Sequence, residues 1–195
     1  MPLSTLDPNC WVSLADLKDH MDIDSSDTDR DTFLIGILNS AYHMAKNYIG
    51  HDLIVADYTE YYNGEGEDTI LLKAYPVNSI ASIYDDPDRE FGAETLIDSD
   101  NYFVDAATGL VTLFQGLVAF STGRGNIKVT YNAGYSTIPY DAQRGLMMLA
   151  AWLAQRAGSE GMIAQTLGGK SEQYDPSVIP LYIRQCFIPY KEITC

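Results

Sequence analysis

Three cysteines are few for a chain of 195 residues, and their spacing supports no shared site. Cys10, Cys186 and Cys195 lie far apart, and no Cys-x-x-Cys pair occurs. A zinc ribbon and a redox dithiol both need such pairs, so the sequence predicts neither. Distant cysteines in odd number instead indicate reduced thiols in a cytosolic setting.

The sequence predicts neither a leader nor a membrane span. Its first residues, MPLSTLDPNC, contain no basic region followed by an apolar stretch, so no secretory signal is predicted. The apolar run Leu146–Ala154 is far shorter than the roughly 20 residues that a bilayer requires. We therefore expect no membrane partner, and a protein that is used inside a cell or leaves it by lysis.

Positive charge is scarce. Twelve Lys and Arg residues face 27 Asp and Glu residues, which gives a net charge of −15 and a pI near 4.3. Binding to DNA by counterion release requires a basic surface, so this balance argues against a nucleic-acid reader. A surface that repels DNA, or one that mimics it, remains compatible with the charge.

Motifs of catalysis are missing as well. No Gly-x-Ser-x-Gly, His-Glu-x-x-His or Rossmann glycine pattern occurs, and His20, His43 and His51 are the only histidines. The segment Leu167–Ser171 resembles a phosphate loop, but Ala164 stands where its first glycine belongs, and we expect a surface loop. Because carboxylates are plentiful, a glycosidase pair stays open without any particular pair being indicated.

An acidic link, Asp22–Asp31, invites comparison with a calcium loop. From Asp22, the sixth position is Asp27 instead of glycine and the twelfth is Phe33 instead of glutamate. The register from Asp27 also fails. We therefore predict no metal site, no cofactor and no enzyme activity, and expect Asp27, Asp29 and Asp31 to cap the following helix and compensate its dipole.

Apolar periodicity predicts four helices. A short helix capped by Ser13 runs through Leu14, Leu17 and Met21, and a long amphipathic helix from about Phe33 ends at Gly50. A last helix begins near Val178, with Pro180 in its first turn, and carries an apolar stripe before Pro189 ends it. The members of this stripe are Ile179, Ile183 and Phe187.

The third helix, residues 141–157, follows Pro139, with Ser136 and Thr137 as candidate caps. One face carries Leu146, Leu149, Ala150, Leu153 and Ala157. The other side is apolar too, and its residues are Met147, Met148, Ala151 and Trp152. A helix that is apolar nearly all round needs cover on several sides, either within one subunit or from a second copy of the chain.

Between the second and third helices the period changes to two. Short β-rich runs from Leu53 to Tyr131 alternate with Gly, Asp and Asn turns, which predicts six or seven strands in an antiparallel sandwich or barrel. The sequence therefore predicts an α+β fold in which a small helical bundle, residues 1–52 and 133–195, carries a β-rich insertion, residues 53–132.

Five stretches in this order resemble the head–tail connector proteins of tailed bacteriophages, also called adaptor or head-completion proteins. The stretches are SLADLKDHMDID through NYIGHDLI, Pro76–Asp85, Asn101–Gly109, VTYNAGYSTIP with the helix after it, and Leu181–Tyr190 followed by Lys191. The long β-rich insertion with its acidic turns departs from the family pattern.

The resemblance implies a structural virion protein, made in the host cytoplasm, that forms a ring of about twelve copies in the neck. Such a ring lies below the portal protein, extends the DNA channel, and offers a platform to a downstream neck or tail-terminator protein. Genomic DNA would pass without specific binding. Met147, Met148, Ala151 and Trp152 would then pack between subunits, and the portal or neck contacts would be Phe187, Tyr190 and Lys191.

Two other classes stay open beside the connector. An acidic DNA mimic would order its carboxylates on one face and act as a monomer or dimer, so its sedimentation mass would differ from that of a ring. A hydrolase would use the β-rich region and would respond to carboxylate-to-amide changes.

Overall fold

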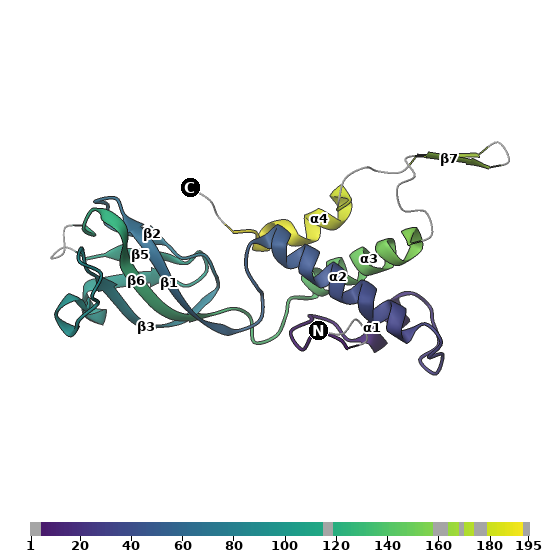
Figure 1. Cartoon of the computed structure of the whole chain (residues 1–195), viewed down its shortest axis with the longest axis horizontal. Helices are drawn as coiled ribbons and strands as arrows, with labels where there is room; N and C mark the ends of the chain where they lie inside the picture. The colour runs from purple at the N-terminus through teal and green to yellow at the C-terminus, as the bar shows by residue number, and fades with distance from the viewer. Residues whose placement is uncertain (1–4, 115–118, 158–163, 168–169, 174–178, 193–195) are drawn as a thin grey trace. The chain divides into compact units, whose positions relative to one another are not determined.

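The computed structural model describes residues 5–114, 119–157, 164–167, 170–173 and 179–192. These residues form two compact units (Figure 1). Residues up to Gly50 and Ile138–Lys191 make a helical unit, whereas His51–Thr137 together with Glu192 make a β-rich unit. The boundaries predicted from the sequence lie between residues 52 and 53 and between residues 132 and 133. The helices and two small antiparallel sheets confirm the predicted α+β class.

The first two helices begin and end where the sequence predicts. Helix α1, Leu14–His20, starts with a capping box in which the Asp16 amide donates to Ser13 Oγ at 3.1 Å and the Ser13 amide donates to Asp16 Oδ2 at 3.0 Å. Helix α2, Asp31–Ile49, ends at Gly50, whose φ of 101° lies in the left-handed region that glycine adopts without steric cost.

The prediction that the aspartates of the link between α1 and α2 cap α2 is wrong. The N-cap position is Arg30, which makes no side-chain capping bond. The Asp27 carboxylate instead accepts the Asp29 amide at 3.1 Å. Asp31 lies in the first turn, as dipole compensation requires, and its carboxylate pairs with the buried Lys18 ammonium at 2.5 Å. These acids therefore order the link and join it to α1.

Helix α3, Tyr140–Arg156, packs against α1, α2 and α4. Its N-cap is Pro139, without a side-chain cap, so the expectation that Ser136 or Thr137 caps it is wrong. Proline already fixes the φ that the first turn needs and has no amide that requires a partner. The buried residues of α3 are Ala142, Gly145, Leu146, Leu149, Ala150 and Ala154.

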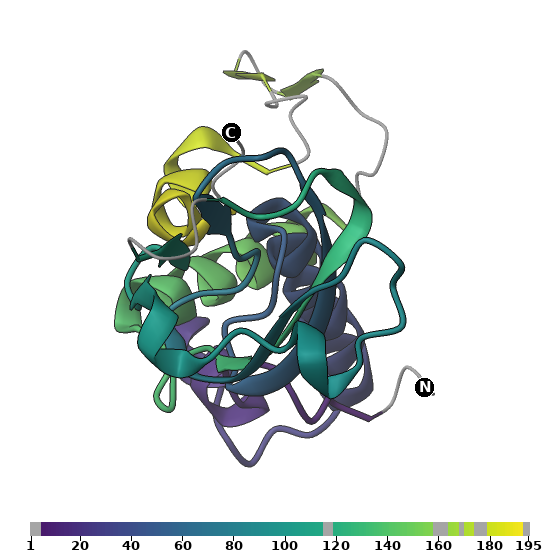
Figure 2. The same cartoon turned by 90° about the vertical axis from the view of Figure 1, so that its left-hand side faces the viewer.

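Helix α4, Leu181–Phe187, continues into a short 3₁₀ turn, η3, Ile188–Tyr190. The predicted stripe of Ile179, Ile183 and Phe187 is buried as expected. Phe187 contacts the edge of the Trp11 ring, with 6.3 Å between ring centroids. Among the four helices, α4 lies at the top in both views, and the α1–α2 link lies at the bottom of the helical unit (Figures 1 and 2).

The described residues of the β-rich unit form six strands in two antiparallel sheets. In the first sheet β6, Gly123–Ala133, lies between β1, Ala56–Gly64, and β3, Val77–Asp85. In the second sheet β5, Leu110–Leu113, lies between β2, Thr69–Leu71, and β4, Tyr102–Asp105. Two 3₁₀ turns, η1, Ala93–Thr95, and η2, Ser99–Asn101, precede β4. All strand pairs are antiparallel, as predicted.

Both sheets contribute to one apolar core. Ile127 and Val129 alternate along β6 with partly exposed neighbours, as the period-two pattern predicts. They join Ile83 of β3 and Val111 of β5 in the same buried cluster. The two sheets are therefore stabilised against each other by burial of apolar side chains.

Strands β7, Ala164–Leu167, and β8, Lys170–Gln173, pair antiparallel after α3. The sequence predicts a surface loop for Leu167–Ser171, and that prediction is wrong for Leu167, Lys170 and Ser171, which lie in these strands. Polar side chains and a central Gly-Gly gave little period-two apolar signal. The two glycines of the phosphate-loop comparison, Gly168 and Gly169, lie outside the described residues.

Candidate interaction surfaces

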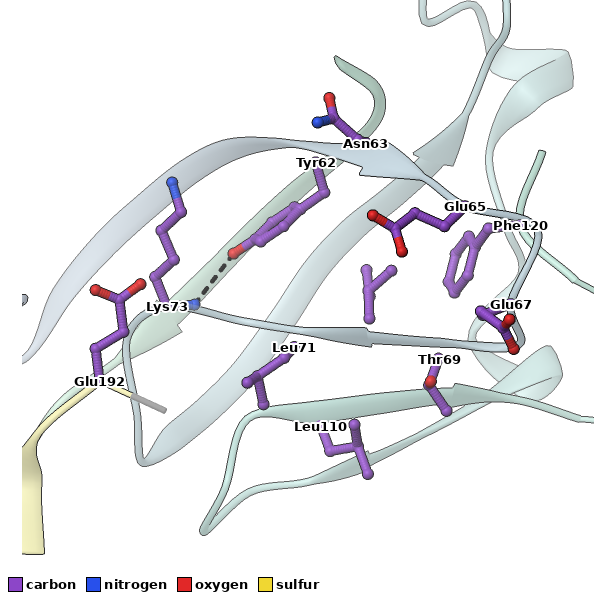
Figure 3. A pocket seen from close by; sticks show the side chains of 11 residues that line it. Tyr62, Asn63, Glu65, Glu67, Thr69, Leu71, Lys73, Leu110, Phe120 and Glu192 are labelled. Atoms are coloured by element: carbon purple, nitrogen blue, oxygen red, sulfur yellow. Dashed lines mark hydrogen bonds between the residues drawn. The ribbon is translucent and has the colours of Figure 1, made fainter. Parts of the chain in front are cut away.

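A hollow of the β-rich unit has a volume of about 490 Å³ and is lined partly by acids. Figure 3 shows Glu65 and Glu67 at one end, and Lys73 with Glu192 at the other. Between them, the Tyr62 hydroxyl accepts a hydrogen bond from the Lys73 amide at 3.2 Å. This hollow is the place where a hydrolase site would be sought.

The tyrosine in this hollow is held protonated. Burial, and next its hydrogen bond to Glu60, raise the pKa of the Tyr62 hydroxyl far above its usual value. The Tyr131 hydroxyl donates to Glu60 Oε2 at 2.8 Å, and burial raises its pKa as well. Tyr131 also accepts the Ala74 amide at 3.1 Å. These phenols are hydrogen-bond donors that tie strands together, and they are poor bases or nucleophiles.

The histidines do not assemble into a site. His51 is buried, and its Nδ1 lies 2.8 Å from the backbone oxygen of Asp52. His43 Nε2 lies 3.6 Å from an Asp7 carboxylate oxygen on the surface of the helical unit. His20 is exposed at the end of α1. Throughout the described ranges, no three His, Cys, Asp or Glu side chains are arranged to hold a metal ion.

One candidate surface is the outer face of α3. Met147, Met148, Ala151 and Trp152, the residues predicted to pack between subunits, are all partly exposed. The Arg156 guanidinium lies over the Trp152 ring at 4.8 Å. The half-buried state leaves apolar area on this face that a second molecule would cover. The prediction that it packs between subunits stays a prediction.

The residues predicted to contact the portal or neck require a correction. Phe187 has no exposed surface, and Tyr190 is only 8% exposed. Both belong to the core of the helical unit, where the Tyr190 hydroxyl donates to Asp141 Oδ1 at 2.5 Å. They lie inward because the chain turns at Ile188–Tyr190 and folds the ring of Tyr190 back toward α3. Of the three residues, only Lys191 is exposed.

The sequence reasoning missed the outer face of α4. Leu181, Tyr182 and Ile188 are 63%, 55% and 54% exposed. Leu181 and Tyr182 lie on the side of this short helix away from the buried Ile183 and Phe187, and Ile188 follows in η3. The sequence contained a signal for this face, because α4 has apolar residues on both of its sides. The prediction considered only the stripe of Ile179, Ile183 and Phe187, whose members are four positions apart.

A groove between α2 and α4 adjoins this face. It has a volume of about 450 Å³ and is lined by Met44, Asn47, Tyr48, Ile179 and Arg184. The lining contains three apolar or aromatic side chains, one cation and no acid. The Arg184 Nε donates to the Ile179 backbone oxygen at 2.5 Å, which holds the guanidinium at the groove. The Lys191 ammonium lies 5.4 Å from the Tyr48 ring centre.

None of the helices in the described part of the chain has the length and apolarity needed to cross a membrane. What the helical unit offers is therefore a set of surface features. They are the outer face of α3, the outer face of α4, the α2–α4 groove and the acidic α1–α2 link. Features of this kind suit contacts with other proteins.

Comparison with known proteins agrees with the arrangement of these parts. The family model described as "Head completion protein" matches residues 11–193. No curated protein matches. These results give no support to the DNA-mimic or hydrolase alternatives.

Solved structures with the same fold come from gene transfer agent (GTA) particles. A chain from the neck of an empty GTA particle, computed with C6 symmetry, has a TM-score of 0.62 and 17% sequence identity. A chain from the virion of the native particle has a TM-score of 0.62 and 16% identity. A chain from the neck of the native particle, computed with C12 symmetry, has a TM-score of 0.59 and 17% sequence identity. Each alignment covers 98% of this chain and 94% of the other. With a family match over most of its length, the chain belongs to the head completion protein family.

Proposed function

We propose that this protein forms a ring in the neck of a phage-like particle, where it connects the head to the tail. Membership of the head completion family makes it a structural virion protein of the head–tail connector, located in the neck. The observation that carries the proposal is the family match over residues 11–193, which includes both units of the fold.

The ring would contain about twelve copies. The similar chains come from necks computed with C6 and C12 symmetry, which supports a cyclic assembly here. A ring of identical subunits requires a heterologous contact, in which two different surfaces of the same chain meet. The several partly apolar surfaces of the helical unit can supply such a pair.

One of these surfaces would be the outer face of α3. Met147, Met148, Ala151 and Trp152 are partly exposed on a helix whose other side is buried. Covering them with a neighbouring subunit would remove further apolar area from water, at about 25 cal/mol per Å². Long methionine side chains also adapt well to a partner surface.

The ring would bind the portal protein on one side and a downstream neck or tail-terminator protein on the other. Genomic DNA would pass through its centre without specific binding. The net charge of −15 supports this proposal, because carboxylates that face a channel repel the phosphate backbone and let DNA slide. We further propose that the protein acts by assembly alone and catalyses no reaction.

Deleting the gene that encodes this protein tests the function. We expect filled heads that carry a portal but no tail, and complementation with the wild-type gene should restore tailed particles with a neck ring in averaged electron micrographs. Tailed, infectious particles made without the protein would contradict the proposal.

A further inference from the structure

The helical unit is electrically polar along α2. The link that precedes α2 exposes one cation, Arg30, and four aspartates, Asp22, Asp24, Asp27 and Asp29, so its charge is negative on balance. The groove beside the last turns of α2 contains Arg184 in its lining, and Lys191 lies next to the groove residue Tyr48. Since α2 has 19 residues, the two regions are separated by about 28 Å along one rigid helix.

Compensation of the helix dipole does not account for this distribution. The dipole acts within the first and last turns of a helix, and each charge there contributes only about 0.3–1 kcal/mol. Asp31 in the first turn of α2 and Lys46 in its last turn already compensate the dipole of this helix. Asp22 and Asp24 precede α2 by more than one helical turn, and Arg184 and Lys191 belong to α4 and the segment after it.

The groove itself is suited to a polar chain segment with a few apolar side chains. Met44, Tyr48 and Ile179 give it apolar walls, whereas Asn47 and Arg184 supply hydrogen-bond donors. The α1–α2 link has the matching character, because the partly exposed Ile23 lies between Asp22 and Asp24, and the partly exposed Met21 precedes them. A guanidinium that meets a carboxylate forms one of the stronger charge-assisted hydrogen bonds.

Repulsion between copies restricts where a contact can form. Two chains that each carry a net charge of −15 repel unless cations of one meet acids of the other. Among the described residues of α3 and the segment 179–191, four cations accompany a single acid, Asp141, which binds the Tyr190 hydroxyl. The cations are Arg144, Arg156, Arg184 and Lys191.

We propose that the α2–α4 groove binds the aspartate-rich α1–α2 link of a second copy of this chain. Acid and cation lie at opposite ends of one helix, so each copy offers a link to one neighbour and a groove to the other. Such a contact is head-to-tail, the type that forms a ring when the rotation between neighbouring copies closes. The proposal rests on the ring of the proposed function, and it assigns Lys191 to the subunit contact instead of the portal.

Introducing charges of the opposite sign on either side tests the contact. The link variant is Ser25→Lys with Asp29→Lys, two exposed side chains that form no hydrogen bond within the described chain. The groove variant is Arg184→Glu with Lys191→Glu. With full-length protein and purified portal, we expect each variant to lower the amount of assembled ring at least about tenfold, since like charges would meet.

A matched control has the same chemical changes in the other unit. Ser99→Lys with Asp100→Lys replaces an exposed serine and aspartate of η2 in the β-rich unit. Ring yield should stay within about twofold of wild type for this control, because exposed charges away from a contact have small effects. A loss equal to that of the link variant would overturn the proposal.

Mixing the two variants gives the sharpest readout. The basic link of one variant should fit the acidic groove of the other, while the unchanged link and groove fit each other. An equimolar mixture should therefore assemble rings in which the two variants alternate, and native mass spectrometry should find equal copy numbers. Such rescue also shows that both variants are folded.

The outcomes separate the contact from the function. If the wild-type protein forms rings and each variant forms them in equal yield, the groove–link contact is overturned, whereas the connector function still stands. A mixture that stays unassembled although both variants melt like wild type would also overturn it. Absence of wild-type protein from the necks of particles would instead contradict the connector function itself.

Discussion

Gly145 of α3 lies against Phe187 of α4 with no room for a side chain between them. A Cβ atom at position 145 would be 2.9 Å from Cε1 of the Phe187 ring and 2.7 Å from Cβ of Cys186. Real Cβ atoms do not approach other atoms this closely. The close approach of the two helices therefore depends on glycine at this position.

We expect Gly145→Ala to lower the free energy of unfolding by about 1–2 kcal/mol. Overpacking costs about 1–3 kcal/mol, and the better helix propensity of alanine returns up to about 1 kcal/mol. Urea denaturation would measure the change. In a Phe187→Leu background the penalty should be smaller, and an equal penalty in both backgrounds would show that the Phe187 ring is not the obstacle.

Leu149→Asp should prevent folding of the helical unit. Leu149 has no exposed surface, so the variant would bury an unpaired carboxylate at a cost of several kcal/mol. Circular dichroism and solubility would report the loss. Gln155→Asp, at an exposed position of the same helix, serves as control and should change stability by no more than about 0.5 kcal/mol. Soluble, ring-competent Leu149→Asp protein would refute the assigned core.

Acid should destabilise the β-rich unit through Asp86. Burial acts to raise the pKa of this carboxyl, but the Asp88, Glu90 and Phe91 amides, which donate at 2.9, 2.9 and 2.6 Å, outweigh it and lower the pKa. A pKa that is lower in the folded state gives stability that is present above about pH 4 and is lost as the pH falls through the folded value.

The Asp86→Asn variant measures this contribution. Its amide oxygen keeps part of the acceptor capacity but cannot titrate, so we expect the variant to be less stable than wild type at pH 7. The difference in urea midpoint should shrink at pH 3. A difference that stays constant between pH 7 and pH 3 would mean that Asp86 does not titrate in this range.

Ala151→Glu on the outer face of α3 should separate folding from assembly. The residue is partly exposed, so the free protein should melt within a few degrees of wild type. A charge in an apolar subunit contact should nevertheless abolish ring formation on the portal. Ala151→Ser is the matched control, and full assembly of Ala151→Glu would exclude this face from the contact.

The free protein should show no measurable DNA affinity at physiological salt. Its net charge of −15 opposes the counterion release that drives non-specific binding. Fluorescence anisotropy with labelled duplex DNA would test this. Tight binding that persists above about 0.2 M salt would contradict an acidic, non-adhesive channel.

Local signals in the sequence were sufficient for most of the secondary structure. Ser13 with Asp16 and the glycine at position 50 predict helix ends because capping depends on residues close in the chain. The alternation through Ile127 and Val129 predicts a strand for the same reason, since side chains of a strand point to opposite faces. The α+β class and the family resemblance follow from the order of these signals.

Surface and core could be assigned only by the tertiary structure. Phe187 and Tyr190 are apolar residues near the end of the chain, and nothing local says whether such residues meet a partner or their own core. The packing of α4 against α3 at Gly145 decides that they are buried and that Leu181 and Ile188 face outward. The α2–α4 groove likewise combines Met44 of α2 with Arg184 of α4, which lies 140 positions further along the chain. Contacts between residues so far apart in the sequence depend on long-range packing, which a periodic pattern along the chain does not encode.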